Sequence, residues 1–248
     1  MTSIITEPPV PTLPRKRWTI EEFERLARAD FLREGGRIDL WDGDIITDRS
    51  TELVRKRWTI EEFDRLMLAG FIREGSRTFL WDGEIIAPMP EYAPHVNACE
   101  NLADALKARL VRDAWTVNGG RPIALAEGFL PQPDIVVARG PRSGYRNGPP
   151  TAADAALVVE VASTSYHFDA GEYLRHYAVR GIPLYWIIHL KFRRVEVFSG
   201  PIPGESRFEH RTDYGLGDTI PLVLSQGGST FGYEGIAVEA ILRDSMED

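Results

Sequence analysis

The stretch PQPDIVVARG at residues 131–140 opens the part of the chain that decides the fold, and this part extends to residue 188. It contains three short apolar runs, at residues 135–137, 157–161 and 184–188. Each run is rich in β-branched residues and bounded by Gly, Pro or charge, which predicts three buried strands. A helix is predicted at residues 171–179, where Gly181 and Pro183 would end it before the third strand. This strand-helix-strand crossover predicts an α/β or α+β sheet protein.

Two carboxylates interrupt these apolar runs. Asp134 stands at the head of the first run and Glu160 in the middle of the second. A charge inside a buried strand costs several kcal/mol unless a metal, a cation or hydrogen bonds compensate it. Because consecutive strands can pair, both carboxylates could meet at one edge of the sheet and form a hard-oxygen site for Mg²⁺ or Mn²⁺.

A structural explanation of the two acids remains open beside the functional one. Asp134 could cap a turn, since it follows Pro133 at the start of a strand. Glu160 could pair with an arginine, for which Arg121, Arg175 and Arg180 are the candidates.

The sequence around this stretch alternates between helical and extended patterns. Apolar residues recur with a helical period over residues 95–111, and residues 115–126 are a candidate strand. Further strands are predicted at residues 194–198, 208–211 and 218–222, followed by an amphipathic end at residues 234–242. The loop RGPRSGYRNGPP at residues 139–150 is either a solvated connection or a basic and aromatic grip for phosphates and a base.

A repeated segment precedes this region. Residues 15–47, the first copy, return at residues 55–87, the second copy, with about 23 of 33 positions identical. Each copy has a threonine N-cap (Thr19 or Thr59) before a short helix, at residues 20–29 and 60–69, and then a Trp-Asp-Gly hairpin turn. Two copies are too few for a solenoid, so we interpret one copy as docked in the fold and the other as spare. The second copy is the expected docked one because it continues directly into the rest of the chain.

We therefore divide the chain into a flexible tail (1–14), an extra copy (15–54) and a main domain (55–248, core 55–200). The net charge of −8 disfavours non-specific binding to nucleic acid but does not exclude a local basic face. The single cysteine, Cys99, rules out an internal disulfide and is interpreted as a small core residue. A reducing, cytoplasmic location is expected from this and from an N-terminus unlike a signal sequence. The sequence contains no run of about 18 apolar residues, so it predicts no membrane span.

The order of several short motifs resembles the Uma2 family, also known as the DUF820 group. These motifs are Trp-Asp-Gly-Glu-Ile-Ile at 81–86, Met89-Pro90, Pro133-Asp134, Val-Glu-Val-Ala-Ser at 159–163, Asp-Ala-Gly-Glu-Tyr-Leu at 169–174 and Gly-Ile-Pro-Leu-Tyr-Trp at 181–186. The resemblance covers residues from about 55 to about 200. That family is assigned to the PD-(D/E)XK restriction-endonuclease-like superfamily. It implies a mixed central β-sheet flanked by helices and a Mg²⁺-dependent DNA endonuclease, with Asp134 and Glu160 as the metal-binding acids.

Two positions depart from the family pattern. The family has a lysine four residues after the aspartate matched here to Asp169, where this chain has Tyr173. The family also usually has an acid before the Leu-x-Asp-Gly turn, where the second copy has Phe79 and the first has Asp39. A phenol titrates near pH 10 and does not supply the lysine's cation.

Three substitutes for the missing groups are open. The first copy could dock and restore an acid through Asp39. His176, three residues after Tyr173 and on the same helical face, or Arg175 could replace the lysine. Tyr173 could itself position a water without activating it.

The sequence therefore supports two main hypotheses. The first is a metal-dependent endonuclease with Asp134 and Glu160 as ligands and Tyr173 or His176 in the lysine's place. The second is a catalytically inactive member of the same fold that binds DNA or a protein partner. A third hypothesis is a homodimer formed by exchange of the first copy.

Overall fold

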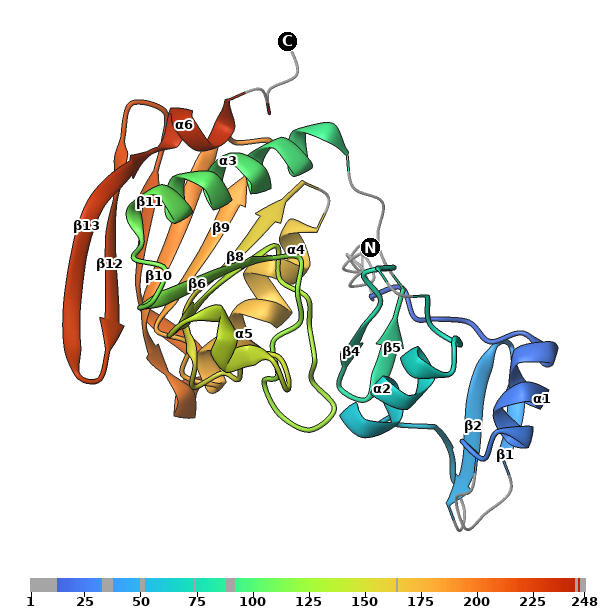
Figure 1. Cartoon of the computed structure of the whole chain (residues 1–248). Coiled ribbons are helices and arrows are strands. Elements are labelled where there is room, and N and C mark those ends of the chain that lie inside the picture. Colours follow the sequence, from blue (N-terminus) through green and yellow to red (C-terminus); the bar gives the residue numbers. More distant parts are fainter. Residues whose placement is uncertain are drawn as a thin grey trace, which may run out of the picture.

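The computed structural model of the chain describes residues 13–32, 38–49, 52–73, 75–87, 92–163, 165–243 and 245 (Figure 1). Most of the predicted tail and the Met89-Pro90 motif lie outside the described residues. Among the described helices, none is long and apolar enough to span a membrane.

A six-stranded mixed sheet forms the centre of the main domain, with strand order β11-β10-β9-β8-β7-β6. Strands β8 and β9 run parallel, and the other neighbouring pairs in this sheet are antiparallel. Every residue of β8 is buried, as expected for a central strand covered on both faces. The bounds are β6 Trp115–Gly119, β7 Ile135–Arg139, β8 Ala155–Ala162, β9 Leu184–His189, β10 Arg194–Ile202 and β11 Arg207–Tyr214.

Helices cover both faces of this sheet. Helix α3 (Ala93–Arg109) packs Ala98, Leu102 and Leu106 on one face. On the same face lie the hairpin of β12 (Thr219–Gln226) and β13 (Ser229–Ala237) and the short helix α6 (Val238–Leu242). The opposite face carries α4 (Tyr166–Phe168), a π-helical turn at Asp169–Tyr173 and α5 (Leu174–Val179) as one continuous helical segment. The predicted fold class, a mixed sheet flanked by helices, is confirmed.

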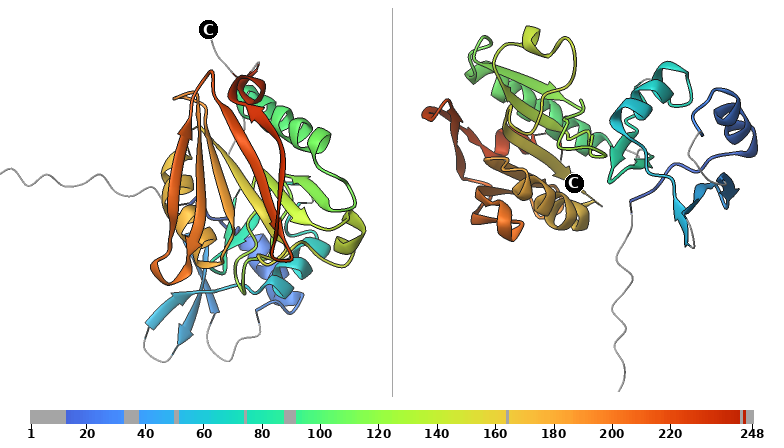
Figure 2. Two further views of the ribbon diagram at one scale, coloured as in Figure 1. Left: turned by 90° about the vertical axis from the view of Figure 1, so that its left-hand side faces the viewer. Right: turned by 90° about the horizontal axis from the view of Figure 1, so that it is seen from below.

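The two copies of the repeat form a separate group beside the sheet (Figures 1 and 2). The first copy contains α1 (Ile20–Arg28), β1 (Ile38–Trp41) and β2 (Asp44–Arg49), and β3 (Glu52–Arg55) leads from it into the second. The second copy contains α2 (Ile60–Leu68), β4 (Phe79–Trp81) and β5 (Glu84–Ile86). Both helices start with the expected threonine cap and a reciprocal glutamate bond, through Thr19 and Thr59.

The second copy is the one docked on the main domain. Leu80 and Leu130 exchange backbone hydrogen bonds of 2.7 and 3.4 Å, and the Gly83 amide donates to the Gly128 carbonyl at 2.8 Å. The first copy lies farther from the sheet and packs on the second copy (Figure 1). The division of the chain into domains stays a prediction.

Three predicted element boundaries are wrong. The strand expected at 115–126 ends at Gly119, because the chain then turns away and Pro122 has no amide for a ladder. The helix expected at 171–179 begins earlier, at Tyr166, with its π-helical turn in the middle. The amphipathic end expected at 234–242 is divided, with strand up to Ala237, where β13 pairs with β12, and helix from Val238 to Leu242.

Candidate active site

Asp134 and Glu160 meet at one edge of the central sheet, as their positions on adjacent strands predict. Asp134 precedes β7, and Ile135 pairs with Val159 of β8, which places Glu160 opposite Asp134. The Asp134 amide donates to Glu160 Oε2 at 3.3 Å, and the Val161 amide donates to Asp134 Oδ2 at 2.8 Å. Each of the two carboxylates therefore accepts a hydrogen bond from a backbone amide at or beside the other acid.

Two side chains from outside the central sheet, Arg77 and His95, contact the carboxylate of Asp134. Arg77 of the second copy donates to Oδ1 at 2.8 Å, and His95 Nε2 of α3 lies 3.1 Å from Oδ2. Burial by itself would raise the pKa of Asp134, but the His95 hydrogen bond and the Arg77 charge outweigh it, so the pKa lies below its ordinary value. Arg77 and His95 therefore favour the charged form of Asp134.

Glu160 has a different environment. Its Oε1 accepts a hydrogen bond of 2.8 Å from the Tyr177 hydroxyl, and both partners are buried. Burial and the negative charges of Asp134 and Asp169 raise the pKa of Glu160 well above its ordinary value. The arginines considered from the sequence lie elsewhere, since Arg175 pairs with Glu172 at 2.6 Å and Arg180 lies over the Phe129 ring.

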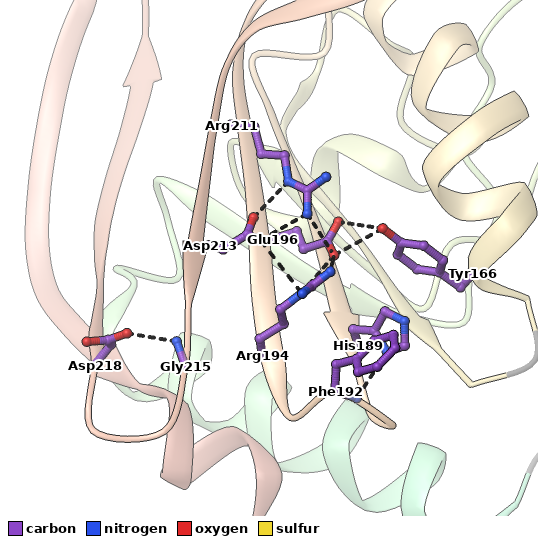
Figure 3. Close-up of polar contacts among 9 residues, drawn as sticks. All are labelled: Tyr166, His189, Phe192, Arg194, Glu196, Arg211, Asp213, Gly215 and Asp218. Carbon is purple, nitrogen blue, oxygen red and sulfur yellow. Dashed lines mark hydrogen bonds and ion pairs between the residues drawn. The ribbon is translucent and has the colours of Figure 1, made fainter.

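A second buried glutamate provides a useful contrast (Figure 3). Glu196 on β10 is fully buried but is paired with Arg194 at 2.7 Å and Arg211 at 3.1 Å, and the Tyr166 hydroxyl donates to it. This carboxylate is thus neutralised by arginines from its own strand and from β11. Among the described residues, Glu160 accepts hydrogen bonds only from neutral donors, the Asp134 amide and the Tyr177 hydroxyl, and it has two acids nearby, so its charge is under-compensated.

Asp169 is a third acid of the site. Burial raises its pKa to about 7, opposed by a hydrogen bond of 2.7 Å from Ser165 and reinforced by the charge of Asp134. Asp169 lies in the π-helical turn, a geometry that often marks functional positions. The sequence motif contained this residue, but its part in the acid cluster depends on the helix packing against β8.

Tyr173 and His176 occupy different surroundings although they are three residues apart. Burial, followed by the charges of Glu160, Asp169 and Asp134, raises the pKa of Tyr173 well above its ordinary value. His176 Nε2 instead lies 3.1 Å from Glu172, and its ring packs 4.7 Å from Trp81. The structure thus brings Tyr173 to the acids and His176 to the contact with the second copy.

Three residues of the site were missed in the sequence. Arg77 comes from the second copy, and His95 and Cys99 are four residues apart on one face of α3. His95, Cys99 and Asp134 each offer one possible ligand atom, and these three atoms lie within 4.8 Å of one another. Such a group could hold a metal ion. The spacing of His95 and Cys99 was the available signal, whereas nothing local marked Arg77.

Phe79 on β4 takes the position where the family usually has an acid, because the second copy is the docked one. Asp39 lies on β1 in the first copy, which packs on the second copy rather than on the sheet. Docking of the first copy, with Asp39 in the place of the missing acid, was one possibility left open by the sequence. It does not occur in this structure.

A basic hollow lies between β6 and the loop at residues 142–150. Arg121, Arg142 and Arg146 are exposed and line a hollow of about 690 Å³ together with Asn118 and Tyr145. Among the described residues, its lining includes no carboxylate. A Cβ atom placed on Gly120, next to Arg121, would lie 3.9 Å from the Arg77 guanidinium carbon, so the hollow begins beside the partner of Asp134.

A mixed sheet between helices, with paired acids at one edge, places the chain among nuclease-like folds. A solved structure of similar fold is described as "a putative nuclease belonging to DUF820 from Anabaena variabilis ATCC 29413". It has a TM-score of 0.54 and 14% sequence identity, and the match covers 76% of this chain and 99% of that one. A comparison with curated proteins found no match. The model of the Uma2 family, described as "Putative restriction endonuclease", matches residues 60–228, and the chain belongs to this family.

Proposed function

We propose that the protein is a Mg²⁺- or Mn²⁺-dependent DNA endonuclease of the Uma2 type in which Asp134 and Glu160 hold the ion. The observation that carries this proposal is the pair of buried carboxylates at the sheet edge, joined by the 3.3 Å contact between the Asp134 amide and Glu160, of which Glu160 has no cationic partner among the described residues. The family match and the fold of the Anabaena protein support the same reaction class.

The donor set fits a hard divalent cation. Asp134 and Glu160 bring two carboxylates together at the sheet edge, and burial followed by the charges of Asp134 and Asp169 raises the pKa of Glu160. Oxygen donors of this kind suit Mg²⁺ and Mn²⁺, whereas His95 and Cys99 would add softer donors for a transition metal. When bound, a divalent ion supplies Lewis acidity to a phosphodiester and to a water.

The protein's own residues fix the positions of these donors. The Val161 amide and Arg77 orient Asp134, and the Tyr177 hydroxyl orients Glu160. The Tyr173 ring packs 4.7 Å from the Trp81 ring, which fixes its position beside Tyr177, the hydrogen-bond donor to Glu160. The second copy therefore helps to build the site through both Arg77 and Trp81.

The absence of the family's lysine suggests reduced activity. Tyr173 occupies the lysine's position with a phenol of raised pKa, which orients a water but provides no positive charge. Phe79 also replaces an expected acid. We therefore propose a slow nuclease rather than an efficient one.

The test is Mn²⁺ binding by calorimetry on the wild type and on Glu160→Gln, which keeps the size of the side chain. A plasmid-nicking assay on the same samples follows, with Glu172→Gln as the control because Glu172 pairs with Arg175 outside the acid cluster. We expect binding and nicking to be lost in Glu160→Gln and retained in Glu172→Gln. Unchanged Mn²⁺ binding in Glu160→Gln would reject the proposed ligand.

The alternative function is a catalytically inactive DNA-binding protein. It is favoured by the arginine-lined hollow at residues 121–146, since unopposed arginines bind phosphates and Tyr145 offers a ring for a base. DNA binding that is lost in Arg142→Glu/Arg146→Glu, without cleavage in any metal, would select this alternative. A cleaved product that requires both metal and Glu160 would dismiss it.

A further inference from the structure

The two copies of the repeat contact each other through equivalent residues. The rings of Trp18 and Trp58 lie 5.7 Å apart, and those of Phe31 and Phe71 lie 5.6 Å apart. In both pairs each residue meets its own counterpart, about 40 positions away in the sequence. Residues that meet their counterparts lie on or near a two-fold axis, so the contact has the form of an isologous dimer interface.

The contacts away from this axis are reciprocal. Arg25 of the first copy lies 4.6 Å from the centre of the Phe71 ring, and Arg65 of the second copy lies 4.7 Å from that of Phe31. Arg25 and Arg65 are equivalent positions, as are Phe31 and Phe71. Each copy therefore donates the same cation to the same ring of the other.

The backbone contacts are exchanged in the same way. The Lys16 amide donates to the Ile85 carbonyl at 2.7 Å, and the Lys56 amide donates to the Ile45 carbonyl at 2.8 Å. The extended segment before each helix thus pairs with the hairpin of the other copy. The residues that make these contacts are identical in the two copies.

The two copies differ in what covers the tryptophan of the hairpin turn. Trp81 of the second copy is 5% exposed because it packs on the main domain, whereas its counterpart Trp41 is 77% exposed. The first copy is thus bound through the shared interface and not through the surface that docks the second copy on the sheet.

We infer that the first copy occupies, within one chain, the surface through which the second copy would otherwise bind a second copy of this chain. The surface is self-complementary, because each of the ring, cation–ring and backbone contacts described above could be made with another second copy through the same residues. Attachment in one chain gives the first copy a high effective concentration, so it outcompetes a partner chain. The protein is therefore a monomer organised around an internal pseudo-dimer. This inference does not depend on the proposed nuclease activity.

The test is the molar mass of the full chain by light scattering over a hundredfold range of concentration. The wild type should have the mass of one chain throughout. Trp18→Ala/Phe31→Ala removes the aromatic half of the first copy, and its mass should double as concentration rises. Adding Trp58→Ala/Phe71→Ala removes the surface on the second copy and should restore the single-chain mass. Trp41→Ala, an exposed aromatic outside the interface, is the matched control and should leave the mass unchanged.

Each result decides the inference. A wild type that is dimeric at all concentrations would overturn it, since the first copy would not then shield the surface. A folded Trp18→Ala/Phe31→Ala variant that stays a single chain would overturn it as well. Circular dichroism establishes that each variant is folded, and the wild-type mass remains informative if a variant is not.

Discussion

Replacing Tyr173 by lysine should increase the rate of DNA cleavage. The side chain is 8% exposed, and burial together with Glu160, Asp169 and Asp134 raises its pKa. The same three carboxylates would hold a lysine ammonium in its charged form against the effect of burial. General acid–base catalysis typically contributes 10²- to 10⁴-fold, so we expect an increase of at least about 100-fold.

The same substitution should lower stability. Tyr173 packs 4.7 Å from Trp81 and 6.2 Å from Tyr177, and these ring contacts are lost. An aromatic pair is worth about 0.5–1.5 kcal/mol beyond its buried area, whereas the lysine stem keeps part of the packing. We expect a net loss of about 1–3 kcal/mol in the free energy of unfolding without metal, measured by urea denaturation.

The assay is plasmid nicking in Mn²⁺, with Tyr173→Met as the control because methionine fills the space without a charge. Tyr173→Lys/Glu160→Gln tests whether the gain uses the proposed metal site. The reasoning is refuted if Tyr173→Lys and Tyr173→Met bind Mn²⁺ like the wild type and nick DNA equally slowly.

Three further predictions concern the acids and the docking of the second copy. Arg77→Met should tighten Mn²⁺ binding about tenfold by calorimetry, because a cation 2.8 Å from Asp134 competes with the ion; weaker binding would contradict this. The pKa of Asp169 is raised to about 7, so the metal-free protein should lose up to about 4 kcal/mol of stability between pH 4 and 7, and Asp169→Asn should flatten this dependence in urea titrations. Gly128→Ala should lower the melting temperature, because Gly128 has a φ of 76° and the new Cβ would lie 3.0 Å from the Gly83 amide nitrogen; an unchanged value would show that the loop adapts.

The sequence by itself determined the class of fold and the two main acids. The short, β-branched apolar runs around Asp134 and Glu160 predicted buried strands, and adjacent strands bring the two carboxylates to one edge. The capped helices and hairpin turns of both copies were also local signals, because Thr59 and Glu62 lie within one turn of each other. Such features depend on contacts between residues close in the sequence.

The tertiary structure alone decided which residues complete the site. Arg77 reaches Asp134 from 57 positions away, and its contact exists only because the second copy docks through Leu80 and Gly83. His176 has the helical spacing expected of a substitute for the lysine, but aromatic packing turns it toward Trp81. Helical periodicity gives the face of a residue, whereas the neighbouring element decides what that face contacts.

The arrangement of the two copies shows the same limit. Their similar sequences give both copies the same helix and hairpin, and only the direct continuation of the second copy into the main domain favoured it as the docked one. The tertiary contacts of the two copies differ. Trp81 of the second copy packs against Phe129 and Tyr173 of the main domain, whereas Phe31 of the first copy packs against Phe71 of the second. A local pattern specifies a copy's own helix and hairpin, but burial of its apolar faces is a property of the whole fold and is decided only when all elements pack together.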